Sequence, residues 1–307
     1  MSDLASAQAP QASLESVGVI HDIGYQRYTG PRLGRSYAVR SLYSHGLRTA
    51  FGMGRSAAAK IFPWAVFGLV MMVAAILAAI RSQSGEMPIT YWGFPGPISV
   101  LIVLFCAVVG PELVSRDIRG VVLPLYFSRP LTRSDYAVAK WAALVSAVAL
   151  LLAAPMLLMF LGGAFTVDGT AAVWSEFVQF TKGLAMAGVY ALVFGSLSIV
   201  VASVAGRRAV AAALIVALFL VTTPVWGVLM GIAYSGDEDG VLTGSKLVLS
   251  QVAGLVSPGT LVGGVGTWLF DPARPLGGYG PVYGAVALAL TALAVLLLLL
   301  RYRKVAR

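Results

Sequence analysis

Long apolar segments, each about the length of a membrane span, alternate with short charged segments along the chain. Seven long stretches without Asp, Glu, Lys or Arg lie between Lys60 and Arg301. Each can hold the roughly 20 apolar residues that cross a bilayer as a helix. Six of these stretches predict continuous spans, at residues 61–80, 95–111, 137–165, 183–205, 209–233 and 283–300. The pattern is typical of an all-α integral membrane protein with six transmembrane helices.

Two local signals refine this reading. The stretch that is not counted as a span, residues 247–270, is rich in glycine and contains Pro258. Glycine and proline disfavour one continuous helix, so short or re-entrant helices on the outer side are expected there. Thr132 and Asp135 match the capping-box pattern, which predicts that one helix starts at that point and continues to about Phe165.

The basic residues decide the orientation of the spans. With six spans, only Arg81, Lys182, Lys246 and Arg274 of the 22 Lys and Arg residues fall on the outer side. Cytosolic flanks of membrane spans carry the excess of Lys and Arg. Both termini are therefore predicted in the cytosol, since a seventh span would carry the basic C-terminus outside.

The segment before the first span divides into two parts. Residues 1–35 are predicted as a cytosolic N-terminal segment that is partly disordered, and residues 36–307 as the six-span domain. Residues 36–60 favour a helix with Leu42, Leu47 and Ala50 on one side, which suits an interfacial helix that leads into the first span. A plain solvated cytosolic helix is the alternative.

Composition supports membrane insertion and excludes several partners. The chain is 58% hydrophobic and 11% charged, with a mean hydropathy of +0.84, whereas soluble domains carry about 25% charged residues. The formal net charge of +9 then reflects topology and anionic headgroups, and no basic soluble domain is present to bind nucleic acid. With Cys106 as the only cysteine, neither an internal disulfide nor a thiolate metal cluster is expected.

The sequence also lacks the residues that membrane enzymes and proton-coupled transporters use. No ionisable residue falls in the middle of a predicted span, and His21 and His45 both precede the first span. Proton-coupled transport normally needs buried ionisable groups, and no phosphate-binding loop of the G-x-x-x-x-G-K-[ST] type occurs. We therefore expect no catalytic residues and no metal site. Energy for any transport would come from another polypeptide.

Between the second and third spans, charged residues flank a short apolar block. We interpret this hairpin as a coupling element: apolar side chains give affinity for a soluble partner and the flanking charges give orientation. The alternative is that the block lies in the membrane interface. The residues assigned to coupling are Glu112, Arg116, Asp117, Arg119, Val121, Leu123, Leu125, Tyr126, Phe127 and Arg129.

Two runs of sequence carry a family resemblance. Residues 112–140, ELVSRDIRGVVLPLYFSRPLTRSDYAVAK, closely resemble the cytosolic loop of type 2 ATP-binding-cassette (ABC) exporter permeases. Residues 21–52, HDIGYQRYTGPRLGRSYAVRSLYSHGLRTAFG, are similar to the segment before the first span in a bacterial branch of that family. With the six-span layout, the resemblance covers nearly the whole chain.

The resemblance implies a specific assembly in a bacterial cell membrane. Two permease subunits, expected to form a homodimer, would pair with two ABC ATPase subunits that carry ATP and Mg, with no cofactor in this chain. An N-terminal connecting helix would lie at the membrane surface, and a coupling helix near residues 121–127 would sit in an ATPase cleft. The second and fifth spans would line the export path. Ser257 and Pro258 would belong to an outer gate.

Within the path the sequence offers only Phe105, Thr222, Thr223 and Pro224. Proline in a span frees a backbone carbonyl that the threonines can help to satisfy, so a kink and a substrate contact are both open readings. Phe105 and Tyr190 can equally be packing residues. The function that these features predict is the permease subunit of an ABC exporter for a hydrophobic or amphipathic substrate. The alternative is a membrane anchor or scaffold that binds a cytosolic partner without transport.

Overall fold

The computed structural model describes residues 30, 33–119, 126, 131–205, 207–235, 242, 244–271 and 276–304. The side chains of Arg116, Ile118, Arg119 and Lys304 lie outside this description. The chain divides into residues 1–33 and a compact unit of residues 34–307. The architecture below is that of the second unit.

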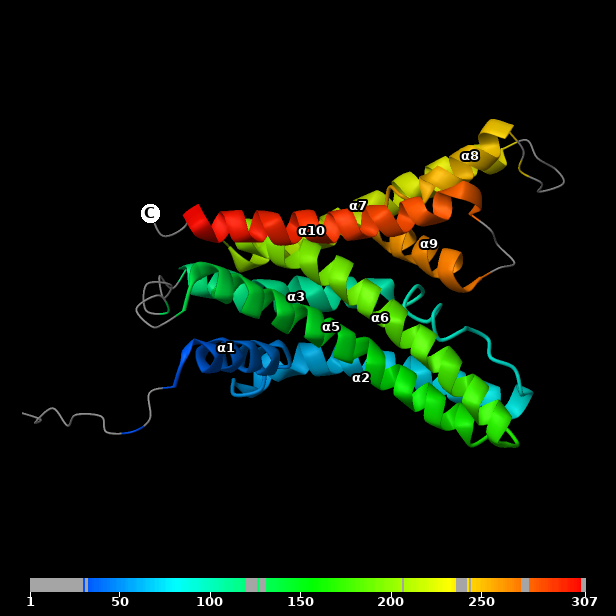
Figure 1. Ribbon diagram of the computed structural model, residues 1–307, viewed down its shortest axis with the longest axis horizontal. Helices are drawn as coiled ribbons and strands as arrows, with labels where there is room; N and C mark the ends of the chain where they lie inside the picture. The colour runs from blue at the N-terminus through cyan, green and yellow to red at the C-terminus, as the bar shows by residue number, and fades with distance from the viewer. Residues whose placement is uncertain are drawn as a thin grey trace, which may run out of the picture. The chain divides into compact units, whose positions relative to one another are not determined.

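Every regular element among the described residues is helical, and five helices are long and apolar enough to cross a bilayer (Figure 1). These are α2 (Ala57–Ser84), α5 (Arg133–Ala164), α6 (Thr170–Val204), α7 (Arg208–Tyr234) and α10 (Gly280–Lys304). The others are α1 (Arg35–Ala50), α3 (Ser99–Arg119), α8 (Gly244–Ala253), α9 (Pro258–Phe270) and the 3-10 turn η1 (Gly277–Tyr279). The predicted all-α integral membrane fold is confirmed.

The second predicted span corresponds to α3, which starts later than expected. Residues 91–98 form turns that include Pro95 and Pro97, and the helix begins at Ser99. Its predominantly apolar part, Ser99–Ser115, is short. However, the 21 residues of α3 extend over about 31 Å, the thickness of the hydrocarbon core. The helix therefore has the length for a sixth crossing.

The glycine-rich segment forms the bent pair α8 and α9. The chain bends by 110° at the short break between them. Helices of 10 and 13 residues bent in this way extend only about 20 Å from end to end, less than the roughly 30 Å of the hydrocarbon core. The pair is thus too short to cross as one span, which matches the expected short or re-entrant helices.

The centre of the bundle is the pair α5 and α6, and α6 also packs on α3, α7, α9 and α10. The helix α5 begins where its sequence indicates. The Thr132 hydroxyl accepts a hydrogen bond from the Asp135 amide (3.2 Å), and the Asp135 carboxylate accepts one from the Thr132 amide (3.0 Å). The capping box is confirmed. It is followed by one unbroken helix to Ala164.

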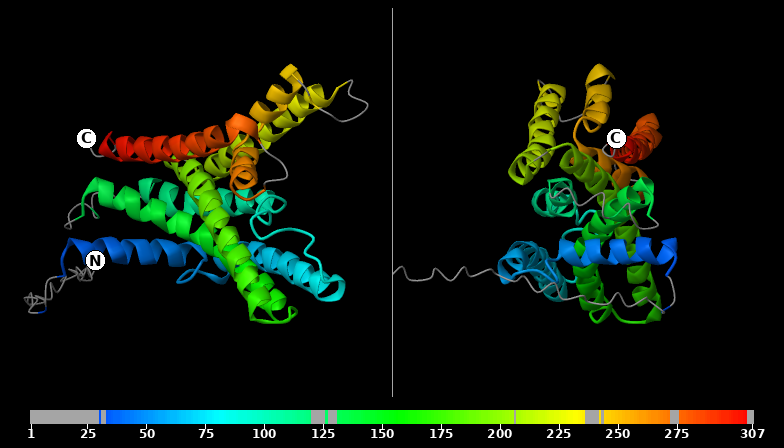
Figure 2. Two further views of the ribbon diagram at one scale, coloured as in Figure 1. Left: turned by 45° about the vertical axis from the view of Figure 1, so that its right-hand side comes forward. Right: turned by 90° about the vertical axis from the view of Figure 1, so that its left-hand side faces the viewer.

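Helix α1 packs along the start of α5, and α2 follows it along the same helix (Figure 2). Leu42, Gly46 and Ala50 form a buried line on α1, and a Cβ atom at Gly46 would lie 2.9 Å from the Cβ of Ala143. The exposed side includes Arg40 and Arg48. The apolar pattern of this segment is therefore accounted for by packing within the bundle.

Candidate functional site

The hairpin predicted to couple to a partner joins α3 to α5, and its apolar tip falls mostly outside the described residues. Tyr126 is described, and Arg116 and Arg119 are described as positions in α3 but not as side chains. The predicted residues outside the description are Val121, Leu123, Leu125, Phe127 and Arg129. The structure therefore defines the base of this hairpin, where it meets the bundle.

Asp117, near the end of α3, binds two side chains of α5. Its Oδ2 lies 2.8 Å from Nζ of Lys140 and accepts a 2.7 Å hydrogen bond from the Tyr136 hydroxyl. The same Nζ lies 5.4 Å from the centre of the Tyr136 ring. Lys140 and Tyr136 are buried, and these charge-assisted bonds hold the two arms of the hairpin together.

Three tyrosines continue this contact away from the ion pair. The Tyr126 and Tyr136 ring centroids lie 5.6 Å apart, and those of Tyr136 and Tyr302 lie 5.1 Å apart. Tyr302 belongs to the last turns of α10. Tyr126 was expected in a ridge that faces a partner, but its ring is half-buried and packs on the bundle. It thereby links the hairpin to α5 and α10.

Glu112 ties two more segments to the same end of the bundle. Its carboxylate, in α3, pairs with Arg55 of the loop between α1 and α2 (2.5 Å) and with Arg208 at the start of α7. Glu112 is buried, whereas Arg208 is more than half exposed. Glu112 was among the residues predicted for coupling, but neither arginine was. The sequence feature that could have indicated Arg55 and Arg208 is their position next to the ends of predicted spans.

Arg35 links α1 to the capping box of α5. Its guanidinium forms two 2.7 Å hydrogen bonds with the Asp135 carboxylate and a 3.3 Å bond with the Thr132 hydroxyl. The hydrogen bonds with Asp135 raise the pKa of Arg35. The group is exposed, so this pair contributes orientation more than stability.

The residues predicted for a substrate path occupy two different settings. Phe105 is fully buried, and its ring centroid lies 5.8 Å from that of Phe51. Thr223 and Pro224 are exposed on α7. This arrangement favours a packing role for Phe105, whereas Thr223 and Pro224 are on the exposed face of α7.

The hydroxyl groups of Thr222 and Thr223 donate hydrogen bonds to backbone carbonyls of their own helix, α7. Thr222 donates to the carbonyls of Leu218 and Phe219, and Thr223 donates to that of Phe219. Thr222 also lies 3.4 Å from the hydroxyl of Ser257, at the bend between α8 and α9. Of the two threonines, Thr222 alone has a described contact with a residue of the predicted gate.

The residues predicted for an outer gate, Ser257 and Pro258, are buried at the N-terminus of α9. The bent pair is held by α10, where Tyr283 lies against Gly254 and Gly264 and donates a 2.6 Å hydrogen bond to the Gln251 carbonyl. These contacts fix α8 and α9 on α10.

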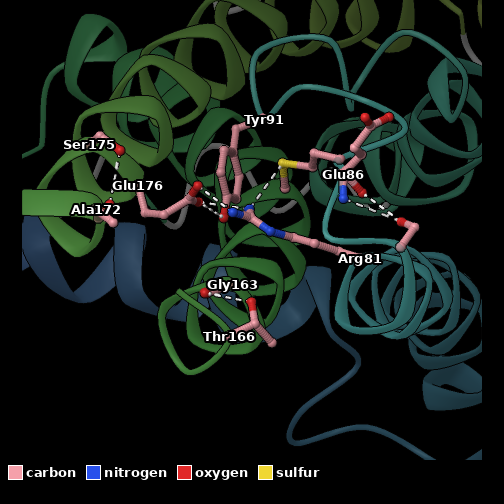
Figure 3. A network of polar contacts seen from close by, with 10 residues as sticks. Arg81, Glu86, Tyr91, Gly163, Thr166, Ala172, Ser175 and Glu176 are labelled. Atoms are coloured by element: carbon pink, nitrogen blue, oxygen red, sulfur yellow. Dashed lines mark hydrogen bonds and ion pairs between the residues drawn. The ribbon is translucent and has the colours of Figure 1, made fainter. Parts of the chain in front are cut away.

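The opposite end of the bundle carries a buried ion pair that sequence reasoning did not find (Figure 3). The Arg81 guanidinium makes two bonds to the Glu176 carboxylate, one of them 2.8 Å long, and a 3.4 Å contact with the sulfur of Met87. The Tyr91 hydroxyl donates a 3.0 Å bond to Glu176. Burial raises the pKa of Tyr91, so the phenol keeps its proton and remains a donor. The network joins α2, α6 and the loop before α3.

The sequence profile described as an ABC-2 family transporter protein matches residues 5–305. The chain belongs to this family. No curated protein matches it significantly. As an ABC-2 family protein, the chain is a multi-pass membrane subunit of an ABC transporter, and the family implies association with an ABC ATPase.

The chemistry of the described residues fits an ABC-2 family membrane subunit, which is generally non-catalytic. Within the described part of the chain, no group of three or more His, Cys, Asp and Glu residues is placed to hold a metal ion. Among the described side chains of the hairpin base, Asp117 is paired with Lys140, and Glu112 is paired with Arg55 and Arg208. This arrangement suits the transmission of a movement between helices.

Proposed function

We propose that this ABC-2 family subunit is the permease of an exporter in a bacterial cell membrane, with both termini in the cytosol. Two copies of the chain would pair with two ATPase subunits, which bind and hydrolyse ATP with Mg. ATP-driven closure of the ATPase pair would move the hairpins and open a central path outward. The observation that carries the proposal is the junction of Asp117 with Lys140 and Tyr136, which joins the end of α3 to the start of α5.

The base of the hairpin supports transmission of movement over a long distance. Asp117 lies at one end of α3, and Glu112, a little more than one turn earlier, is paired with Arg55 and Arg208. A displacement of the hairpin would therefore reach α7 and the loop before α2 directly. Packed helices with ion-paired ends transmit such displacements because cores are rigid.

The surface of α7 supports pairing of two copies. Of the 18 residues in the most apolar stretch of α7, only 17% are buried within the chain. Gly227 and Gly231 lie on this helix, and a Cβ atom added at either glycine would have no neighbouring atom within 4 Å. Small residues allow helices to approach closely in a membrane. Exposed Thr223 and Pro224 would then lie near the axis between the copies.

The apolar character of α7 supports the proposed class of substrate. Between Arg208 and Tyr234 the helix contains no second charged residue. A path lined by such a helix would favour a hydrophobic or amphipathic substrate over a small ion, because a charged solute needs compensating polar groups in the membrane.

The first test replaces Leu125 and Phe127 of the hairpin with Asp and measures co-purification of the ATPase encoded beside the permease. We expect association to be lost. Met53→Asp is the matched control, because Met53 is an exposed apolar residue of the loop between α1 and α2. Undiminished association of the hairpin variant would contradict the proposal.

The second test separates transport from anchoring. Vesicles that contain the permease and its ATPase should move a labelled amphipathic substrate when ATP is added, and the Leu125→Asp/Phe127→Asp variant should not. Association with the ATPase but no ATP-dependent flux with any candidate substrate would favour a scaffold.

The third test addresses the second copy. Gly231→Ile on α7 should lower the fraction of dimer measured by light scattering in detergent. Gly68→Ile on α2 is the control, since Gly68 also has open space around it. Equal dimer fractions in both variants would rule out α7 as the contact.

A further inference from the structure

A polar cavity lies at the hairpin end of the bundle, between the second half of α1 and the ends of α3 and α5. Its volume is about 920 Å³, and Arg48, Arg55, Lys140, Glu112 and Asp117 are among its lining residues. A second cavity of about 280 Å³ shares Arg55 and Glu112 with it and adds Arg208 and the first turn of α2. The two cavities share these lining residues and adjoin at the ends of α2, α3 and α7, and together they are called the space below.

The charges around this space do not balance. Lys140 is paired with Asp117, whereas Arg55 and Arg208 share the single carboxylate of Glu112. Arg48 has no acidic partner among the described side chains. Four cationic side chains therefore face two carboxylates. An anion in the cavity would meet a net positive field.

The start of α2 adds to this field. Ser56 makes no capping hydrogen bond with its side chain, and its carbonyl accepts a 3.1 Å bond from the Ala59 amide. Ser56, Ala58 and Ala59 line the smaller cavity, and the Ala58 amide has no described hydrogen-bond partner there. The unpaired amide groups at a helix N-terminus carry partial positive charge and bind phosphate readily. The amides reinforce the arginines, which are the main feature of the site.

An apolar strip runs along α2 from the cavity. Ala58, at the cavity wall, is followed at helical spacing by Phe62, Ala65 and Leu69, and all four side chains are exposed. Positions separated by three or four residues share one side of a helix. A ligand with a charged head in the cavity could thus extend an apolar tail along α2.

We propose that this space binds an anionic phospholipid, with the phosphate near Arg48, Arg55 and Arg208 and an acyl chain on the strip of Phe62 and Leu69. The cavity lies at the ends of three membrane helices, where headgroups are found. Basic residues near the membrane surface attract anionic lipids. The bound lipid would bridge α1, α2 and α7 beside the hairpin base.

The test measures binding to the full-length protein purified in detergent, using dioleoyl phosphatidylglycerol with dioleoyl phosphatidylcholine as the neutral comparison. We expect phosphatidylglycerol to bind and to raise the thermal midpoint, and phosphatidylcholine to do neither. Arg48→Gln should weaken phosphatidylglycerol binding about tenfold, the effect of losing one hydrogen bond to a charged group. Arg48→Lys should keep most of the affinity.

Arg40→Gln is the matched control. Arg40 is exposed on the same helix two turns earlier and does not line either cavity. An equal loss in both variants would show a general surface attraction and overturn the proposal. So would equal binding of the two lipids, or inorganic phosphate that gives the same thermal shift at the same concentration.

Discussion

The ring of Tyr283 in α10 lies so close to Gly264 in α9 that a Cβ atom at that glycine would be 2.2 Å from Cε1 of the ring. A Cβ atom added at the adjacent Gly263 would have no neighbouring atom within 4 Å. Of these two neighbouring glycines, only Gly264 is in close contact with α10. This contact determines which glycines of the segment are structurally required.

We predict that Gly264→Ala destabilises the protein by about 1–3 kcal/mol, because the added methyl group overpacks a rigid ring. Thermal unfolding in detergent is the measurement. Gly263→Ala is the control and should leave the midpoint nearly unchanged. Equal stability of the two variants would contradict the close packing of Tyr283.

We predict that Glu176→Gln lowers the free energy of unfolding by about 2–3 kcal/mol, because it leaves the buried Arg81 guanidinium without a counter-charge. A double-mutant cycle uses the single variants Arg81→Met and Glu176→Met and the double variant Arg81→Met/Glu176→Met. The double variant should lose less free energy of unfolding than the sum of the losses in the two single variants. Additive losses in a double-mutant cycle would mean that the ion pair in Figure 3 does not contribute.

We predict that Glu112→Gln costs about 2 kcal/mol and lowers ATP-driven flux, because Arg55 and Arg208 then repel one another without a shared carboxylate. Unfolding and vesicle transport are both measured. Glu86→Gln, at an exposed position, is the control for loss of one carboxylate. A variant with normal flux and normal stability would exclude Glu112 as a link between α3 and α7.

We predict that Thr222→Val changes the rate of transport more than Thr223→Val does. Both variants lose a hydroxyl that is bonded to a carbonyl of α7, but only Thr222 also contacts Ser257. Initial rates of ATP-driven flux are compared at equal protein amounts. Similar rates for the two variants would indicate that these hydroxyl groups serve the helix alone.

The local features of this fold could be predicted because their causes are local. Charge-free stretches of span length require helices, since a membrane leaves backbone groups no other partner. The capping box of Thr132 and Asp135 involves residues three positions apart, and it marked the start of α5 correctly. The glycine-rich stretch around Pro258 likewise predicted that no single span could form there.

Two pairs of glycines with identical spacing have different surroundings, which only the tertiary structure shows. Gly227 with Gly231 and Gly280 with Gly284 have the same spacing, but Trp268 packs only on the second pair. The ring of Trp268 comes from a different helix. No spacing rule along α10 or α7 could indicate where that ring lies.

Charge and hydropathy along the chain determined that this protein is a multi-pass membrane protein, and the capping box determined where α5 begins. The tertiary structure decided which charges meet: Arg81 binds Glu176 across 95 positions of sequence, and Glu112 gathers Arg55 and Arg208 from two other segments. The physical reason is the distance along the sequence over which each kind of interaction acts. Hydrogen bonding and transfer into the bilayer act on each segment alone, whereas ion pairs and ring contacts depend on distances that exist only after the helices have packed.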